Sequence, residues 1–150
     1  MSTNIKEDIH RLLKKYWGFD TFRSLQEDII VSVLNGNDTL ALLPTGGGKS
    51  ICFQIPGLLV GGTTLVISPL VALMNDQVQN LKQKGISAVA ISAAMPYKEI
   101  EIALNNAAMG HVQFLYVSPE RLANDDFKQK LSYLPVHWDS DHFHEKHINQ

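Results

Sequence analysis

Between residues 39 and 117 the chain alternates short apolar runs with segments of helical periodicity, and this alternation restricts the folds it can adopt. The runs are apolar at most consecutive positions, which is typical of strands covered on both faces. Helical segments between successive strands favour parallel crossover connections. We therefore predict an α/β fold in which a parallel open sheet carries helices on both faces. The predicted strands are TLALL (39–43), TLVIS (64–68), AVAIS (88–92) and FLYV (114–117).

Two helices are predicted ahead of the sheet. Apolar residues at helical spacing over 5–16 predict the first, with Asn4 and Glu7 resembling a capping box and Gly18 ending the helix. The second is predicted over about 24–34. Further helices are predicted from Lys49, over 70–81 and over 100–108, with Gly85 and Gly110 where the last two should stop.

The composition is that of one compact globular unit of 150 residues, with 45% apolar and 19% charged residues. The net charge is −2, so any contact with nucleic acid must be local. Cys52 is the only cysteine and has no disulfide partner in the chain, and its apolar neighbours favour a buried side chain over a reactive thiol. No signal peptide and no membrane-spanning run is found, so we expect a cytoplasmic protein with no membrane partner.

The segment LLPTGGGKS (42–50) joins a predicted strand to a predicted helix, which is the arrangement of a phosphate-binding loop. Its glycines leave several amides open to an anion, and the following helix adds the partial positive charge of its N-terminus. Leu43 stands where the strict motif has glycine, but the strand and helix on either side favour nucleotide binding over a simple glycine turn. The predicted nucleotide-binding residues are Thr45, Gly46, Gly47, Gly48, Lys49 and Ser50, with Lys49 as the catalytic candidate on the β- and γ-phosphates and Ser50 as a ligand of Mg²⁺.

Four segments, in this order and spacing, resemble motifs of the RecQ family of superfamily 2 DNA helicases. The resemblance covers about residues 5–135. It implies an incomplete RecA-like lobe with ATP and Mg²⁺ as cofactors and single-stranded DNA as partner, and in the family this lobe serves DNA unwinding in repair and recombination. The segments are YWGFDTFRSLQEDII (16–30), LLPTGGGKSICFQIPGLL (42–59), TLVISPLVALMNDQV (64–78) and LYVSPERL (115–122).

The resemblance implies that the first of these segments recognises adenine. The Gln26 amide can pair with the N7/N6 edge of adenine, which guanine does not match. Phe19 and Arg23 offer a ring and a planar guanidinium that can stack on the base. Phe22 is left open between core packing and a role in the base site.

The third and fourth segments imply contacts with the backbone of single-stranded DNA. Ser68 and the main chain near Pro69 and Leu70 could bind phosphate. Arg121 could also bind phosphate, and the alternative is a structural ion pair with Glu120 or a neighbouring carboxylate.

The family pattern ends at residue 135. The next family motif, Asp-Glu-Ala-His at the end of an apolar strand, is not found in VHWDSDHFHEKHINQ (136–150), so we expect a divergent, disordered tail there. Asp139 and Asp141 are weak substitutes, because nothing in the pattern would fix their geometry. The tail histidines favour a solvated segment over a metal site, and they are His137, His142, His144 and His147.

These observations predict three parts, namely N-terminal helices with the adenine motif (1–36), a partial ATP-binding domain (37–135) and the tail (136–150). We expect the chain to bind ATP without being an active helicase, as a truncated or frame-shifted first lobe. Two alternatives remain open. One is a nucleotide-binding remnant that does not hydrolyse ATP, and the other is a small P-loop phosphotransferase.

Overall fold

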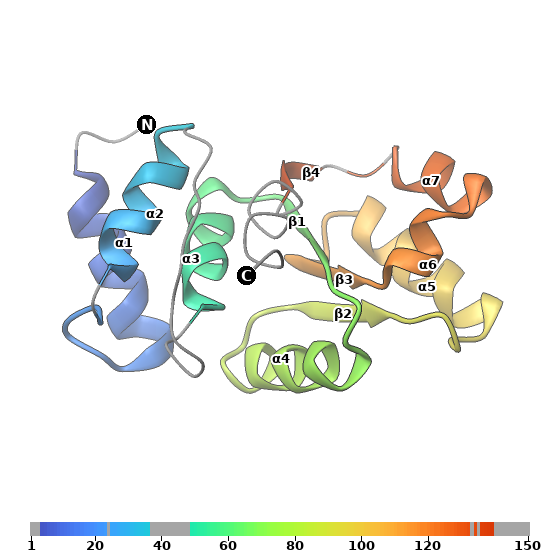
Figure 1. Cartoon of the computed structure of the whole chain (residues 1–150), viewed down its shortest axis with the longest axis horizontal. Helices are drawn as coiled ribbons and strands as arrows, with labels where there is room; N and C mark the ends of the chain where they lie inside the picture. Colours follow the sequence, from blue (N-terminus) through green and yellow to red (C-terminus); the bar gives the residue numbers. More distant parts are fainter. Residues whose placement is uncertain (1–3, 24, 37–48, 133, 135, 140–150) are drawn as a thin grey trace. The chain divides into compact units, whose positions relative to one another are not determined.

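The computed structural model describes residues 4–23, 25–36, 49–132, 134 and 136–139 (Figure 1). The chain forms two compact units, one up to Val60 and the other from Gly61, and each is described by itself. The predicted strand at 39–43 and the glycines at 46–48 lie outside the described residues. No helix in the described part of the chain is long and apolar enough to cross a membrane.

The first unit is a group of helices around an apolar cluster. The first helix, α1 (Ile5–Leu12), runs directly into a π-helical turn, η1 (Leu13–Trp17), and ends at Gly18 as predicted, with φ of 75°. Two more helices follow, α2 (Gln26–Leu34) and α3 (Ile51–Val60). All of these elements contribute to one buried cluster, which consists of Ile9, Leu13, Ile30, Leu34, Ile51 and Ile55.

Two predictions about the helix starts need correction. Asn4 is the N-cap of α1, but its side chain makes no capping hydrogen bond, so the predicted capping box is not formed. The second helix starts at Gln26, two residues later than predicted, because Leu25 has a left-handed backbone with φ of 67°. A left-handed residue that is not glycine is uncommon and cannot continue a right-handed helix, so the chain must turn before α2.

The second unit contains a parallel sheet of four strands in the order β2-β3-β1-β4, with helices between the strands. The α/β fold with a parallel open sheet is therefore confirmed. The strands are β1 (Thr63–Ile67), β2 (Ala88–Ile91), β3 (Phe114–Val117) and β4 (Val136–Asp139). The helices are α4 (Val71–Gln83), α5 (Tyr97–Ala108), α6 (Pro119–Leu122) and α7 (Asp125–Leu131).

Helices cover both faces of this sheet (Figure 1). On one face Leu65 of β1 and Leu115 of β3 belong to the same buried cluster as Leu104 of α5. On the other face the hydroxyl of Tyr116 in β3 donates a hydrogen bond of 2.7 Å to Oε1 of Gln77 in α4. Because successive strand residues point to opposite faces, Leu115 and Tyr116 must lie on different sides, and the runs are apolar throughout for that reason.

Strand β4 corrects the prediction that residues from 136 onward form a tail without a strand. Three of its residues pair in parallel with β1, with Thr63 opposite Val136, Thr64 opposite Trp138 and Leu65 opposite Asp139, and the register shifts between the first two pairs. The sequence VHWD alternates apolar and polar residues, whereas the prediction required a continuous apolar run, so the strand was missed. Residues 140–150, which include Asp141, lie outside the described residues.

Cys52 lies fully buried in α3, and burial raises the pKa of its thiol to about 12. The thiolate is the reactive form of cysteine, and a thiol with this pKa is protonated at neutral pH. These observations support the structural role that was favoured from the sequence.

The raised pKa of Cys52 predicts that alkali destabilises the fold. From pH about 9 to about 12 an unfolded thiol loses its proton while the buried thiol keeps it, so the free energy of unfolding should fall as pH rises. The limiting slope for one proton is about 1.4 kcal/mol per pH unit. Urea titrations of the wild type and of Cys52→Ala across this range measure the effect, and the variant should show a smaller slope. Equal slopes in the two proteins would show that the thiol does not contribute.

Candidate functional site

A pocket of about 340 Å³ in the first unit brings together the residues predicted to bind adenine. Phe19 and Arg23 come from the turn between η1 and α2, and Gln26 is the first residue of α2. Phe19 is half exposed, and Gln26 is buried, with 2% of its surface accessible. A ring at the rim and an amide at depth suit a flat base that stacks and also forms hydrogen bonds along one edge.

Three residues of the pocket wall were not predicted from the sequence, and they are Leu13, Thr21 and Ile51. Leu13 opens the π-helical turn η1, and π-turns are common at functional sites. Leu13 and Ile51 also belong to the buried cluster, so at the sequence level their apolar spacing indicates core alone.

The amide of Gln26 is already oriented in the structure. Its Oε1 accepts a hydrogen bond of 2.8 Å from the main-chain N–H of Arg23. The left-handed Leu25 between them turns the chain so that the amide reaches back to this N–H. A side chain held in one rotamer loses less conformational entropy when a ligand binds.

Phe22, which the sequence left undecided, packs into the core. It lies against the buried cluster of the first unit. Its ring also meets the ring of His10 edge-on, with 4.9 Å between the centroids. Phe22 does not line the base pocket, so the core role is the one that the described contacts support.

Lys49 and Ser50 form the entry to α3. The main-chain oxygen of Lys49 accepts from Cys52 N–H at 3.1 Å, and that of Ser50 accepts from Gln54 N–H at 2.9 Å. These bonds start the helix, so Lys49 and Ser50 lie at its positive end. The next residue, Ile51, lines the base pocket, so the predicted phosphate and base contacts adjoin each other. Thr45 and the glycines at 46–48 lie outside the described residues.

The residues present fit a magnesium ion that arrives with a nucleotide. The hydroxyl oxygen of Ser50 is a hard ligand at the start of α3, and phosphate oxygens and water normally complete the shell of Mg²⁺. Among the described residues no group of three or more His, Cys, Asp or Glu side chains could hold a metal ion.

In the second unit the segments predicted to contact DNA meet at the carboxyl end of the sheet. Ser68 follows β1 and Ser118 follows β3, and the strands are in register at Ile67 and Val117. The ladder continues beyond the strands, because Ser68 N–H donates to Val117 O at 3.1 Å. Ser118 N–H likewise donates to the last residue of β2 at 3.2 Å, and Ser92 follows that residue. Three serines therefore end three adjacent strands.

The hydroxyls of this serine row differ in their partners. Ser68 Oγ accepts from the main-chain N–H of Leu70 at 3.2 Å, which occupies the amide that was predicted to bind phosphate. Ser118 Oγ is buried and has no hydrogen-bond partner in the described part of the chain. A buried hydroxyl without a partner costs about 1–3 kcal/mol. Pro69 and Leu70 directly follow Ser68 in the sequence and are exposed, just before α4 begins at Val71.

Arg121 holds the turn between β2 and α5. Its Nε donates to Ser92 O at 3.0 Å, and its Nη2 donates to Ala93 O at 2.8 Å and to Met95 O at 3.0 Å. A structural role was one of the two possibilities left open by the sequence. The partners are main-chain carbonyls, whereas the sequence suggested a carboxylate.

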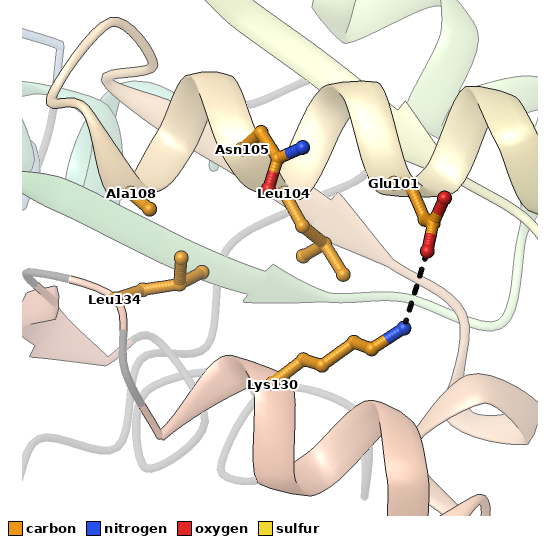
Figure 2. Close-up of a pocket in the computed structure, with 6 residues that line it drawn as sticks. All are labelled: Glu101, Leu104, Asn105, Ala108, Lys130 and Leu134. Atoms are coloured by element: carbon orange, nitrogen blue, oxygen red, sulfur yellow. Dashed lines mark ion pairs between the residues drawn. The ribbon is translucent and has the colours of Figure 1, made fainter.

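A second pocket, of about 200 Å³, lies between α5 and α7, and its lining is shown in Figure 2. Lys130 borders it, with Nζ 3.9 Å from Glu101 and 3.4 Å from Asp126. Its ammonium also donates to the Tyr97 hydroxyl at 2.6 Å, and this bond, with the charge of Asp126, raises the pKa of Lys130. Since its charge is already compensated, this lysine is a poor candidate for phosphate binding.

A sequence model of the DEAD/DEAH box helicase family matches residues 23–136. The ATP-dependent DNA helicase RecQ of Haemophilus influenzae is 42% identical over 83% of this chain and 20% of its own length. RecQ of Bacillus subtilis is 43% identical over 85% of this chain and 22% of its own length. The helicase wrn-1 of Caenorhabditis elegans is 39% identical over 90% of this chain and 13% of its own length.

The predicted resemblance to RecQ helicases is confirmed by these identities. The chain spans about a fifth of the length of the two bacterial relatives.

Two solved structures have a similar fold. The helicase MrfA bound to DNA superimposes with a TM-score of 0.69 at 21% identity, over 93% of this chain and 21% of that chain. A hypothetical ATP-dependent RNA helicase from Sulfolobus tokodaii gives a TM-score of 0.63 at 24% identity, over 87% of this chain and 39% of that chain. These likenesses establish the fold of a helicase domain.

Proposed function

Because the chain belongs to the DEAD/DEAH box helicase family, we propose that it binds ATP as part of the first motor lobe of a RecQ-like DNA helicase. The observation that carries the proposal is the pocket of the first unit. Phe19, Arg23 and Gln26 meet there with Ile51, and Ile51 directly follows Lys49 and Ser50. One nucleotide could therefore place its base among the first group and its phosphates at the start of α3.

In this proposal each element of the site has one task. Phe19 and Arg23 stack on adenine, and the Gln26 amide pairs with its N7/N6 edge. Lys49 and the N-terminus of α3 bind the phosphates. Mg²⁺, held by Ser50 and phosphate oxygens, would supply neutralisation of charge on the β- and γ-phosphates.

The preference for adenine depends on Gln26. We expect Gln26→Ala to weaken ATP binding while GTP binding stays nearly constant, because only adenine offers the matching edge. A lost amide–base pair is worth about 1–3 kcal/mol of discrimination, which is about five- to 150-fold in the ratio of the two dissociation constants. Titration with fluorescent ATP and GTP analogues measures this ratio, and GTP serves as the internal control for folding. A preserved ratio would count against the adenine role.

We further propose that the carboxyl end of the sheet contacts the backbone of single-stranded DNA. The MrfA helicase, which shares this fold, has been solved with DNA and AMPPNP bound. In this chain the segments after β1 and β3 are about fifty residues apart in sequence, yet Ser68 and Ser118 end adjacent strands. This juxtaposition supports the proposal, because the two segments that resemble DNA-contacting motifs end at one edge of the sheet. The exposed Pro69 and Leu70 follow the same edge. Arg121 would support this contact indirectly, because it holds the turn that follows the neighbouring strand β2.

Turnover of Mg·ATP tests the proposed function. Phosphate release by the purified chain should be measured with and without single-stranded DNA, next to direct ATP titrations, with Lys49→Ala as the inactive control. DNA-stimulated release that disappears in Lys49→Ala would establish a motor site. In that case Asp139, which ends β4, is the first carboxylate to replace by Asn. ATP binding without release would support the remnant that binds but does not hydrolyse, and no ATP binding at all would contradict the proposal.

A further inference from the structure

His10 lies outside the base pocket, but it contacts two residues that are sequence neighbours of pocket residues. Its Nε2 lies 2.5 Å from Oε1 of Glu27 in α2. Its ring meets Phe22 edge-on, at 4.9 Å between the centroids and 69° between the planes. Glu27 follows the pocket residue Gln26, and Phe22 precedes the pocket residue Arg23. His10 therefore contacts both ends of the short segment that carries the amide and the guanidinium of the pocket.

The chain between Gly18 and Gln26 needs such support, because its path depends on unusual backbone geometry. Gly18 has φ of 75° and Leu25 has φ of 67°, so left-handed residues stand at both ends of the segment. At Leu25 this geometry costs energy, and a strained backbone persists only where its surroundings hold it. Among the described residues two side-chain pairs link this segment and the start of α2 to the elements before it, namely His10 of α1 with Glu27 and Lys14 of η1 with Asp20.

The His10 pair is the less exposed of the two links. The side chains of His10 and Glu27 are 38% and 33% exposed, whereas those of Lys14 and Asp20 are 63% and 82% exposed. Water and salt screen an exposed pair more than a half-buried one. His10 also adds an aromatic contact with Phe22, which itself packs on the buried cluster.

We propose that His10 is a positioning residue of the base pocket, which holds Arg23 and Gln26 in place through Phe22 and Glu27. This inference rests on the proposed binding of ATP. A positioning role of His10 would affect the binding of the base and not that of the phosphates, because His10 contacts the segment that carries the base contacts. The dissociation constant for ATP should therefore depend on His10, and that for a ligand with phosphates alone should not.

Inorganic tripolyphosphate is the phosphate-only probe. We expect His10→Ala to raise the dissociation constant for ATP by about three- to tenfold and to leave that for tripolyphosphate within about twofold of the wild type. The variant Glu27→Gln should cause a smaller change in the same direction. In the double variant the loss of ATP affinity should be smaller than the sum of the two single losses in binding free energy, because both substitutions remove the same contact. Arg11→Ala is the matched control, because Arg11 neighbours His10 on α1 and, among the described residues, forms an ion pair with Asp8 at 3.4 Å and none with Glu27.

Each outcome decides between distinct conclusions. If the wild type binds neither ATP nor tripolyphosphate, the proposed function fails and the positioning role fails with it. If the wild type binds ATP and His10→Ala binds it equally well, the positioning role alone is overturned. A parallel loss of ATP and tripolyphosphate would show a general structural effect and would also overturn it. If thermal unfolding shows that His10→Ala does not fold, the isosteric Glu27→Gln decides by the same comparison of the two ligands.

Discussion

ATP binding should be lost on replacing Lys49 by alanine. Removing one partner of a close charge pair costs about 2–5 kcal/mol, so the dissociation constant is expected to rise by about thirtyfold or more. The loss should be as large for tripolyphosphate as for ATP, since Lys49 is expected to contact phosphate and not the base. This pattern is the reverse of that expected for His10→Ala and for Gln26→Ala.

Isothermal titration with ATP and with tripolyphosphate measures the effect of Lys49→Ala. Lys98→Ala, which removes an exposed lysine of α5, is the matched control for the loss of one positive charge. Thermal unfolding of both variants should resemble that of the wild type, because Lys49 is exposed as well. Unchanged ATP affinity in Lys49→Ala would refute the assignment of the phosphate loop.

Replacing Arg121 by methionine should destabilise the second unit strongly. The variant loses three charge-assisted hydrogen bonds to main-chain oxygens, of 2.8–3.0 Å, and two of these bonds, to Ser92 O and Met95 O, are partly buried. We expect the free energy of unfolding to fall by about 2–4 kcal/mol, since hydrogen bonds to charged groups contribute about 1.5–3 kcal/mol each and are not additive. Methionine keeps most of the volume of the aliphatic stem, so lost packing contributes little.

Urea denaturation followed by circular dichroism measures this change. The control is Lys128→Met, which removes an exposed cation on the nearby α7 and should change stability by less than about 0.5 kcal/mol. Titration of a fluorescent single strand should accompany both variants. Normal stability of Arg121→Met together with a large loss of DNA affinity would favour a direct contact between Arg121 and phosphate. It would contradict the structural role of Arg121 in holding the turn between β2 and α5.

The elements that were predicted correctly are those in which a local sequence pattern follows directly from burial or from backbone geometry. FLYV is apolar throughout because both of its faces are covered, and β3 has the predicted bounds, Phe114–Val117. Gly18 ends the first helix because its backbone is left-handed. Strand β4 was missed because an alternating VHWD resembles a solvated segment, and its pairing with β1 depends on residues more than seventy positions away. The start of α2 was misplaced because the left-handed geometry of Leu25 leaves no signal in a leucine.

The candidate site shows the same division. Arg23 and Gln26 stand out as polar residues in a motif, and the structure brings both into one pocket. Leu13 and Ile51 could not be separated from the core, because a helical apolar position looks the same whether it faces a pocket or another side chain. The role of Arg121 was hidden for another reason. Its partners are main-chain oxygens 26–29 residues away, and no side-chain pattern records such contacts.

The three hydrogen bonds from Arg121 to the turn between β2 and α5 also affect which substitutions this turn can accept. The hydrogen bonds that the guanidinium makes in the described part of the chain all go to main-chain oxygens of the turn, so the path of the turn does not depend on the side chains at its exposed positions. Ala93 and Ala94 are both exposed there. Many residue types should be accepted at these two positions while the main chain stays in place. The edge of the sheet thus offers a short, sequence-tolerant surface on a fixed support, where new contacts could be selected without loss of the fold.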